Sequence, residues 1–423
     1  MIQKHRMLSM GFAVLAAWGT ARGQNAVTDW NNIAITTALA ASQASAPSSS
    51  TPAGSIIYTT YVHLAIYDAV NAIDHRFQSY GPDIPAPAGA SQEAATIEAA
   101  YRMLLYLFPD QTATLTTQYN AALGVIPNDA SKTDGMQVGQ AAAASVIALR
   151  TGDGRLAVVP YTWPSVPTPG VWIPTPPGFL APAMVWASKM VPFTMSSASQ
   201  FRPEPPPALT STVWTDDYNQ VKALGAANST VRTPEQTEIG LFWTDHTGRQ
   251  YSRAFRALVV ARGLDISDSA HLLAVIYTSG ADALIGCWDA KYYYSFWRPI
   301  TAIRNGDIDG NPDTVADPSW TSLGVTPNHT EYPSAHGCVT GSIATALKKF
   351  FGTPHVTLVV TSPVTNTTHT FTSTNDLEQE VEAARIYAGI HYHHSVVQGV
   401  NLGRKVADQL AGDYFQPLSH NSK

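Results

Sequence analysis

Charged residues are scarce in this 423-residue chain, because Asp, Glu, Lys and Arg together make up only 13% of it. The 31 acidic residues outnumber the 25 basic ones, which gives a formal net charge of −6 at pH 7. Nucleic acids and acidic membrane surfaces are recognised by basic faces, so the composition gives no support for either partner. A small anion site remains compatible with this balance, since it needs only a few local cations.

Cysteine is also rare, and Cys287 and Cys338 are the only two in the chain. In an oxidising compartment they could form one disulfide, but the sequence does not give the distance between them. Two buried thiols are an equal alternative, because cysteine is a common core residue.

Long apolar runs are few, and the one at the N-terminus covers only Met7–Trp18. It follows a short basic stretch at positions 4–6 and precedes small residues at positions 21–23, the pattern of an export signal. A helix of this length is too short to cross the roughly 30 Å hydrocarbon core of a bilayer. We therefore expect residues 1–23 to be a signal peptide, followed by a secreted or periplasmic chain without a membrane span.

Apolar content and helical periodicity are abundant in the rest of the chain. Hydrophobic residues make up 45% of the sequence, which fits a folded globular protein with a large core. Apolar and small residues recur at helical spacing, which predicts an all-α fold built from helical bundles. The predicted helices are Trp30–Ala41, Ser55–Ile73, Ser91–Phe108, Asp110–Leu123, Ala130–Thr151, Ser211–Leu224, Pro234–Thr247, Gln250–Arg262, Ser267–Trp297, a helix from Ser334 or Gly337 to Phe351, and Leu377–Ala411.

A proline-rich stretch divides the predicted bundle into two halves. Residues 158–207 resist helix formation because each proline removes a backbone donor, so we expect an irregular connection that marks a boundary or lines a cleft. This gives an N-terminal helical half at 24–157 and a C-terminal helical half at 208–423. Residues 356–372 are rich in Thr and Val and predict one small β-hairpin.

Candidate functional residues gather in three segments of the second half. The segments are Lys291 followed by Arg298-Pro299, then Pro333-Ser334-Ala335-His336, and finally Arg385 followed by His391. A buried tetrahedral oxyanion needs fixed cations, and arginine and lysine supply paired hydrogen bonds and a point charge. The Ser334 hydroxyl and the N–H groups of the helix predicted to start there would add donors. One histidine would bond the central atom, and the other would move a proton on the opposite side.

In order and spacing, these segments resemble the three-part signature of the superfamily of vanadium-dependent haloperoxidases and type 2 phosphatidate phosphatases. The resemblance covers roughly the last third of the chain and implies the helical fold of the vanadium haloperoxidase and acid phosphatase type. It implies vanadate as the cofactor, with phosphate able to occupy the same site. The implied oxyanion ligands are Lys291, Arg298, Ser334, Arg385 and the backbone amide of Ala335. The resemblance makes His391 the residue that bonds vanadium, or attacks phosphorus in a phosphatase, and His336 the acid/base.

Two further positions are implied to form a halide pocket. Trp288 matches a tryptophan near the halide site of the chloroperoxidases in this superfamily. His329 matches a position that is histidine in the algal bromoperoxidases and phenylalanine in the chloroperoxidases. The resemblance therefore favours bromide over chloride, since such a histidine would tune halide choice or the protonation of bound peroxide.

The chain departs from the pattern of this superfamily at two positions. The superfamily usually has glycine where Ala335 stands, so close approach of the backbone to the anion would depend on an alanine. Its last segment often has an aspartate four residues after the histidine, where this chain has Ser395. In phosphatases that carboxylate orients the nucleophilic histidine, so its absence argues against strong phosphatase activity.

The implied function is a haloperoxidase that oxidises a halide with hydrogen peroxide and releases a hypohalous species toward small organic acceptors, without haem or flavin. The main alternative is an acid phosphohydrolase in which His391 forms a phosphohistidine intermediate and His336 protonates the leaving group. A third alternative is a non-catalytic oxyanion-binding protein with the same fold. The sequence leaves the oligomeric state open.

Three other types of site fit the sequence less well. The stretch 307–313 resembles a calcium loop, but its glycine comes at the fourth position and its twelfth position is proline, so we expect solvated turns. His391 and His394 suggest zinc, since they would share a helix face, but a third ligand with fitting spacing is missing. Ser334 with His336 suggests a serine hydrolase, but no nucleophile elbow surrounds the serine.

Overall fold

The structure, a computed structural model, describes residues 25–418, so the predicted signal peptide lies outside the described residues. Helices dominate the described chain, which confirms the predicted all-α fold. The helices are α1 (Ala26–Ala40), α2 (Pro52–Asp74), α3 (Gln92–Leu107), α4 (Thr112–Gly124), α5 (Ala130–Leu149), α6 (Thr212–Leu224), α7 (Pro234–Phe242), α8 (Thr247–Arg262), α9 (Ile266–Tyr294), α10 (Pro299–Arg304), α11 (Ala335–Phe351), α12 (Thr374–Tyr387) and α13 (His393–Asp413). Short 3-10 helices are η1 (Pro109–Gln111), η2 (Val185–Lys189) and η3 (Gly306–Ile308), and the strands β1 (Leu358–Ser362) and β2 (Thr367–Phe371) form the predicted antiparallel hairpin.

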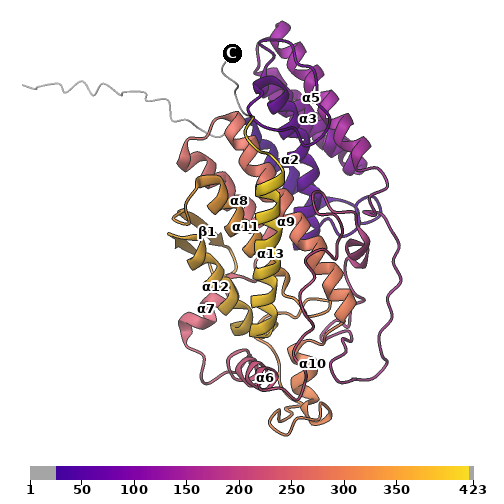
Figure 1. The fold of residues 1–423 in the computed structure, drawn as a ribbon, viewed down its shortest axis with the longest axis vertical. Helices are drawn as coiled ribbons and strands as arrows, with labels where there is room; N and C mark the ends of the chain where they lie inside the picture. Colours follow the sequence, from indigo (N-terminus) through magenta and orange to yellow (C-terminus); the bar gives the residue numbers. More distant parts are fainter. Residues whose placement is uncertain (1–24, 419–423) are drawn as a thin grey trace, which may run out of the picture.

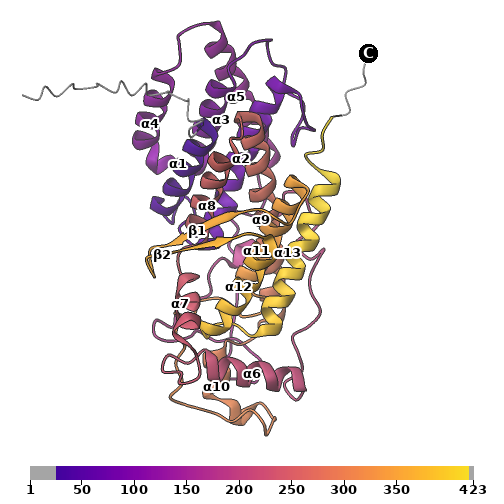
Figure 2. The ribbon, with the colours of Figure 1, turned by 90° about the vertical axis from the view of Figure 1, so that its left-hand side faces the viewer.

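Two long helices, α2 and α9, form the centre of the molecule. Helix α2 packs against α9 and also against α3 and α5, whereas α9 packs against α11 and α13. Helices α1–α5 occupy one end of an elongated molecule and α6 and α10 the other (Figures 1 and 2). The hairpin lies near the middle, where β1 packs on α8 (Figure 2). One continuous cluster of buried apolar residues runs from Ala26 to Phe415, so both halves of the sequence share a core.

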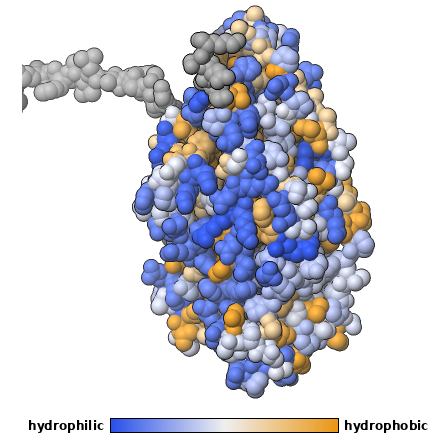
Figure 3. Space-filling model, viewed as in Figure 1, coloured by the Kyte–Doolittle hydropathy of each residue, from blue (hydrophilic) through white to orange (hydrophobic). Residues whose placement is uncertain are grey.

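The central helix α9 is uninterrupted between its two caps. Asp265 caps its N-terminus by accepting a hydrogen bond from the N–H of Asp268, and the helix ends where Ser295 adopts a left-handed φ of 52°. By length and composition α9 could cross a membrane, contrary to the expectation that no internal stretch would qualify. Nearly all of it is buried inside the bundle, so its apolar surface belongs to the protein core. On the face shown in Figure 3, hydrophilic residues cover much of the middle and hydrophobic residues occur in scattered groups.

The prediction of a single helix over Leu377–Ala411 is wrong. The chain forms α12 and α13 with a break over residues 388–392. Gly389 lies in this break with a φ of 75°, and a Cβ there would overlap the carbonyl oxygen of Gly225. Helical periodicity continues on both sides of the break, so periodicity alone could not reveal it. As a result, His391 lies in a turn and does not share a helix face with other histidines.

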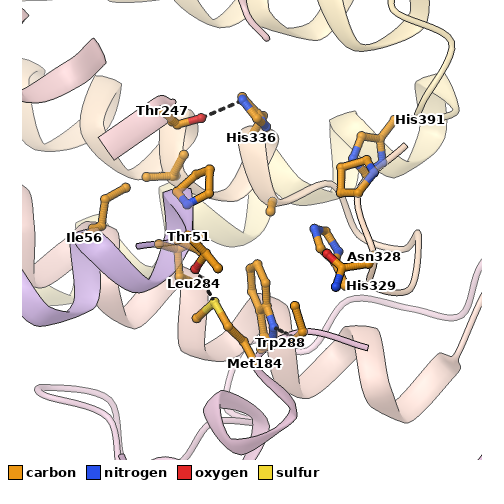
Figure 4. A pocket seen from close by; sticks show the side chains of 16 residues that line it. Thr51, Ile56, Met184, Thr247, Leu284, Trp288, Asn328, His329, His336 and His391 are labelled. Carbon is orange, nitrogen blue, oxygen red and sulfur yellow. Dashed lines mark hydrogen bonds between the residues drawn. The ribbon is translucent and has the colours of Figure 1, made fainter. Parts of the chain in front are cut away.

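A second helix boundary differs from the prediction in a region that also matters for the site. The helix predicted over Pro234–Thr247 ends at Phe242, and α8 begins at Thr247, earlier than predicted. His246 caps α8, because its side chain accepts a hydrogen bond from the N–H of Arg249. Thr247 therefore occupies the first position of α8, from which its side chain reaches a cavity (Figure 4).

The proline-rich connection at 158–207 is irregular apart from η2, and buried Asp282 on α9 holds part of it in place. The carboxylate of Asp282 accepts hydrogen bonds from the backbone N–H groups of Phe193 and Thr194 at 2.6 and 2.7 Å. The connection is thereby fixed against α9, and its residues Ala183 and Met184 line the same cavity as Thr247.

The stretch 307–313 forms a partly buried turn, which corrects the expectation of a solvated one. The carboxylate of Asp309 accepts hydrogen bonds from Trp214 Nε1 at 3.1 Å and from Thr314 Oγ1 at 2.7 Å. Asn311 is also buried and donates to the carbonyl oxygen of Leu209 at 2.9 Å. These polar groups hold the loop against α6, which explains their presence without calcium.

Candidate active site

Three cations from different parts of the chain are buried in the C-terminal half. Lys291 lies in the last turn of α9, Arg298 immediately precedes α10, and Arg385 lies in the last turn of α12. Their exposed fractions are 0%, 0% and 2%. Burial of lysine and arginine to this degree is rare and demands a compensating negative or polar partner.

Backbone carbonyl groups satisfy much of the hydrogen-bonding capacity of Lys291 and Arg298. Lys291 Nζ donates to the carbonyl oxygens of Thr330, Glu331 and Pro333 at 3.0, 2.8 and 2.5 Å. Arg298 donates from Nε to the carbonyl oxygen of His329 at 2.9 Å, and its Nη1 and Nη2 lie 3.2 and 3.0 Å from His391 Nε2 and His329 Nδ1. Both cations are thereby fixed in position by the segment that leads into α11.

The guanidinium group of Arg385 has fewer hydrogen-bond partners than that of Arg298. Its Nη1 donates to the carbonyl oxygen of Trp243 at 2.7 Å, whereas its buried Nε has no hydrogen-bond partner within residues 25–418. A buried N–H without a partner costs about 1–3 kcal/mol, and more when the group is charged. An acceptor atom close to Arg385 would remove this cost.

The three cations greatly outnumber the carboxylates around them. In the described part of the chain, none of the three has a carboxylate oxygen within ion-pairing distance. Desolvation lowers the pKa of Lys291 to about 8 and that of Arg298 to about 10. Desolvation and then the positive charge of Arg298 lower the pKa of Arg385 to about 9. These shifts show that the site is under-compensated and would be stabilised by an anion.

The start of α11 contributes the second predicted segment. Ser334 is fully buried and caps the helix, and its Oγ accepts a hydrogen bond from the N–H of Gly337 at 3.4 Å, which leaves its hydroxyl proton able to donate. Ala335 is the first residue of α11 and does not have a positive φ, so this position does not require glycine. The departure at Ala335 is therefore compatible with the helix N-terminus that the anion site requires.

His336 is the second residue of α11 and lines the same cavity as His391 (Figure 4). Its Nε2 lies 2.7 Å from Thr247 Oγ1, a partner that sequence reasoning missed because the two residues are 89 positions apart. Desolvation and then the nearby cations, first Arg385, hold the pKa of His336 well below its usual range. His336 is therefore neutral at neutral pH, and it becomes a better proton acceptor only when an anion offsets the charge of these cations.

His391 is buried in the turn between α12 and α13, and its partner Glu331 is the main functional candidate that sequence reasoning missed. His391 Nδ1 lies 2.7 Å from Glu331 Oε1, and the same carboxylate oxygen accepts a hydrogen bond from the N–H of Tyr392 at 3.2 Å. Glu331 is fully buried, and desolvation raises its pKa to about 7 against the lowering effect of Arg298 and Lys291. Its position two residues before Pro333, just ahead of the second segment, was the only available signal.

A cavity of about 150 Å³ connects the histidines with the N-terminal half of the chain. His329, His336 and His391 face this cavity together with Trp288 (Figure 4). The ring centroids of Trp288 and His329 are 5.0 Å apart, and Trp288 Nε1 donates to the carbonyl oxygen of Ala183 at 3.3 Å. The structure therefore brings the two predicted halide-pocket residues together beside the cations.

The rest of the cavity wall is mainly apolar. It includes Ile56 from α2, Leu284 from α9, Met184 from the proline-rich connection and Val339 from α11. Met184 is fixed by Thr51, whose hydroxyl lies 3.1 Å from its sulfur (Figure 4). Apolar walls of this kind exclude water and strengthen electrostatic interactions inside the cavity.

The donor set fits a tetrahedral oxyanion better than a metal cation. Within residues 25–418, no group of three or more His, Cys, Asp or Glu side chains could hold a metal ion, which argues against the zinc alternative. The buried Nε of Arg385 and the hydroxyl of Ser334 offer donors, and His391 Nε2 offers one lone pair. Vanadate, an oxyanion that a single histidine can bond, is compatible with these residues. Cys287 and Cys338 are both buried free thiols, the second of the two alternatives for this pair.

Comparison with known proteins relates this geometry to characterised relatives. Residues 271–419 match the family described as the VCPO second helical-bundle domain. The chain is 27% identical over 367 residues to the vanadium chloroperoxidase of Curvularia inaequalis, in an alignment that covers 69% of this chain and 60% of that protein. The chain thus aligns with less than two thirds of the length of this relative.

Two solved structures share the fold over nearly their whole length. The first bacterial vanadium-dependent iodoperoxidase has a TM-score of 0.74 and 22% identity, and the alignment covers 92% of this chain and 97% of the other. A holo-type bacterial vanadium-dependent chloroperoxidase has a TM-score of 0.73 and 15% identity, with the same coverage. At these identities the similarity concerns the fold.

Proposed function

Because this chain belongs to the superfamily of vanadium-dependent haloperoxidases and type 2 phosphatidate phosphatases, we propose that it is a haloperoxidase. It would use vanadate and hydrogen peroxide to oxidise a halide to a hypohalous species, which then halogenates small organic acceptors. Vanadate supplies a Lewis acid that activates peroxide without a change in its own oxidation state. The remaining steps depend on residues of this chain.

The local charge balance is the single observation that carries this proposal. Lys291, Arg298 and Arg385 contribute three positive charges, and Glu331 contributes one negative charge when it is ionised. The buried site then has a net charge of about +2 with His336 and His391 neutral, and a larger positive charge when Glu331 is protonated. A doubly charged oxyanion would neutralise this excess. Burying the excess charge without an anion would cost several kcal/mol per ion, so we expect the site to retain one.

Each residue has a distinct role in this proposal. Arg298, Arg385, the Ser334 hydroxyl and the Ala335 N–H would hold the oxygens of vanadate. Lys291 would add its positive charge, because its three N–H groups already donate to backbone carbonyls. His391 Nε2 would bond the vanadium in place of its contact with Arg298. His336 would accept a proton from peroxide and later return it, with Thr247 holding its ring in place. The negative charge of the oxyanion would offset the cations that lower the pKa of His336.

The halide would enter beside Trp288 and His329. His329 has its pKa held well below the usual range by desolvation and by Arg298, so it is neutral at neutral pH. A neutral histidine and an indole ring create a polarisable pocket wall, which suits the larger and softer bromide ion better than chloride. We therefore propose bromide as the preferred of the two.

One specific observation supports a phosphohydrolase as the second candidate. Ser395 lacks the carboxylate that orients the nucleophilic histidine of phosphatases, but Glu331 contacts His391 Nδ1 from another segment. His391 Nε2 could then attack a phosphomonoester while His336 protonates the leaving group. The absence of aspartate at position 395 is therefore a weaker objection to phosphatase activity than the sequence implied.

Two assays on one preparation separate these functions. Purified protein, freed of phosphate, is incubated with orthovanadate and tested for bromination of a phenol dye with peroxide and bromide, and in parallel for hydrolysis of a chromogenic phosphomonoester. Vanadate-dependent bromination is expected. Phosphomonoester turnover without bromination would favour the phosphohydrolase, and inactivity in both assays despite tight phosphate binding would favour a non-catalytic oxyanion-binding protein.

Two variants test whether His391 binds vanadate and Trp288 contacts the halide. His391→Ala should abolish vanadate retention, whereas Trp288→Ala should retain vanadate and change the halide KM. His393→Ala is the matched control, because His393 lies two residues after His391 with a side chain that is 52% exposed. Equal loss of vanadate from the His391 and Trp288 variants would contradict this division of roles.

We also propose that residues 1–23 direct export, so that the protein works outside the cytoplasm, where it meets peroxide and halide. N-terminal sequencing of the exported product should then begin near Gln24.

A further inference from the structure

The hydrogen-bond pattern around His391 identifies one tautomer of its ring. Arg298 Nη1 lies 3.2 Å from His391 Nε2, and a guanidinium nitrogen can only donate. His391 Nε2 must therefore be an acceptor, which means that it carries a lone pair and no proton. The ring proton of a neutral His391 then resides on Nδ1.

The carboxylate of Glu331 is the group that receives this proton in a hydrogen bond. Its Oε1 lies 2.7 Å from His391 Nδ1 and also accepts from the N–H of Tyr392, so it faces two donors. The contact is fully buried, since the exposed fractions of Glu331 and His391 are 0% and 1%. In such surroundings the other tautomer would place an N–H donor against the Arg298 donor and the lone pair of Nδ1 against the carboxylate oxygen of Glu331, so both contacts would be repulsive.

Glu331 itself is held from several directions. Its N–H donates to the carbonyl oxygen of Phe296 at 2.9 Å, and its own carbonyl oxygen accepts from Lys291 Nζ at 2.8 Å. The residue thus connects the first segment of the site, through Lys291, with the third segment, through His391. A fixed backbone on both sides keeps the carboxylate at one distance from the ring.

We infer that Glu331 is the positioning residue of His391, fixing it in the Nδ1-protonated tautomer with the Nε2 lone pair directed toward Arg298, one of the three cations of the oxyanion site. It thereby supplies from the segment before α11 the carboxylate that Ser395 lacks in the segment after the histidine. Glu331 does not touch the oxyanion in this role and acts only through His391. The role in vanadate binding rests on the proposed function, whereas the tautomer does not.

The tautomer can be measured in the apoprotein by long-range proton–nitrogen NMR of protein labelled with ¹⁵N-histidine. The His391 signals are assigned by their loss in His391→Gln. Wild-type protein should show protonated Nδ1 and unprotonated Nε2. The opposite tautomer in the wild type would overturn the inference without need of any Glu331 variant.

Two substitutions of equal size separate the hydrogen bond from simple packing. Glu331→Met removes the acceptor, so the Nδ1-protonated form should lose its dominance and the Kd for orthovanadate should rise about 10- to 100-fold, the usual effect of removing a group that orients a metal ligand. Glu331→Gln keeps an acceptor oxygen, so the wild-type tautomer should persist with a smaller change in Kd. An unchanged tautomer and unchanged Kd in Glu331→Met would refute the role.

Glu98→Gln provides a matched control in another part of the protein. Glu98 lies on α3, is 1% exposed and pairs with Arg102 at 2.6 Å. Its variant should lower thermal stability and leave the His391 signals and the vanadate Kd unchanged. If the wild type binds no vanadate but Glu331→Met still changes the tautomer, the proposed function fails while the positioning role stands.

Discussion

Substitution of a buried arginine by methionine should change the free energy of unfolding in opposite directions at two positions, Arg385 and Arg150. Arg385 is buried without a carboxylate partner, whereas buried Arg150 forms an ion pair with Asp153 at 2.9 Å. The pKa of Arg385, at about 9, lies well below the usual 12.5 of an arginine, and the difference corresponds to a charging cost of about 5 kcal/mol. Because pH 7 lies below this pKa, Arg385 remains charged and the cost is present.

The expected stability change for Arg385→Met follows from this cost and one lost contact. The hydrogen bond to the Trp243 carbonyl contributes about 1.5–3 kcal/mol, as is typical of a charged donor. The oxyanion-free variant should therefore be more stable than the oxyanion-free wild type by about 2–3 kcal/mol. Arg150→Met leaves Asp153 buried without its partner and should destabilise the protein by about 3–5 kcal/mol.

Ligand-dependent stabilisation should show the opposite order. Phosphate or vanadate at one hundred times its Kd should stabilise the wild type by about 2.7 kcal/mol. In Arg385→Met that increment should nearly vanish at the same concentration, while Arg150→Met should retain it. After exhaustive dialysis, thermal unfolding with and without phosphate gives the stability of the wild type and of the two variants in both states.

One result would refute the reasoning directly. If oxyanion-free Arg385→Met is destabilised as much as Arg150→Met, then Arg385 is adequately compensated within the protein. The net charge of about +2 would then no longer argue for a bound dianion.

Three further predictions concern the catalytic histidine, the turn and acid stability. Thr247→Val removes the hydrogen bond to His336, so kcat should fall about tenfold with an unchanged vanadate Kd, and a weakened Kd with normal kcat would contradict this role. Gly389→Ala forces an alanine into a left-handed conformation, so the free energy of unfolding should fall by about 1–3 kcal/mol or more, as measured by chemical denaturation. Vanadate affinity, measured by calorimetry, should fall with it, because His391 lies in the same turn. Burial lowers the pKa of His271 to about 4. Below pH 6.5 the unfolded chain therefore binds a proton at His271 that the folded chain does not bind. The free energy of unfolding should then fall by about 1.4 kcal/mol per pH unit down to about pH 4. His271→Phe should remove this contribution, and an unchanged slope in urea unfolding between pH 6 and pH 4.5 would show that His271 is not its source.

Much of the fold was predictable because helix formation depends on local spacing. The periodicity of apolar residues identified α2, α9 and α11 to within a few residues, and Thr and Val enrichment identified the hairpin. The break between α12 and α13 was missed, because Gly389 interrupts the helix through a close contact with Gly225 that lies far away in the sequence. The start of α8 was also missed, since His246 is an uncommon cap.

The sequence by itself determined which chemical groups the site contains. The order and spacing of five residues predicted an oxyanion site, because side-chain charge and hydrogen-bonding capacity are properties of each residue. These residues are Lys291, Arg298, Ser334, His336 and Arg385.

Only the tertiary structure decided whether the charges of these groups are neutralised by partners and how their side chains are oriented. It buries the three cations without carboxylate partners, and it pairs His391 with Glu331 across 60 positions and His336 with Thr247 across 89. Burial and distant pairing depend on how α8, α9, α11 and the turn after α12 pack together, and no local pattern encodes such contacts. The physical reason is that a pKa, a tautomer and a net buried charge are set by surroundings, which only the folded chain creates.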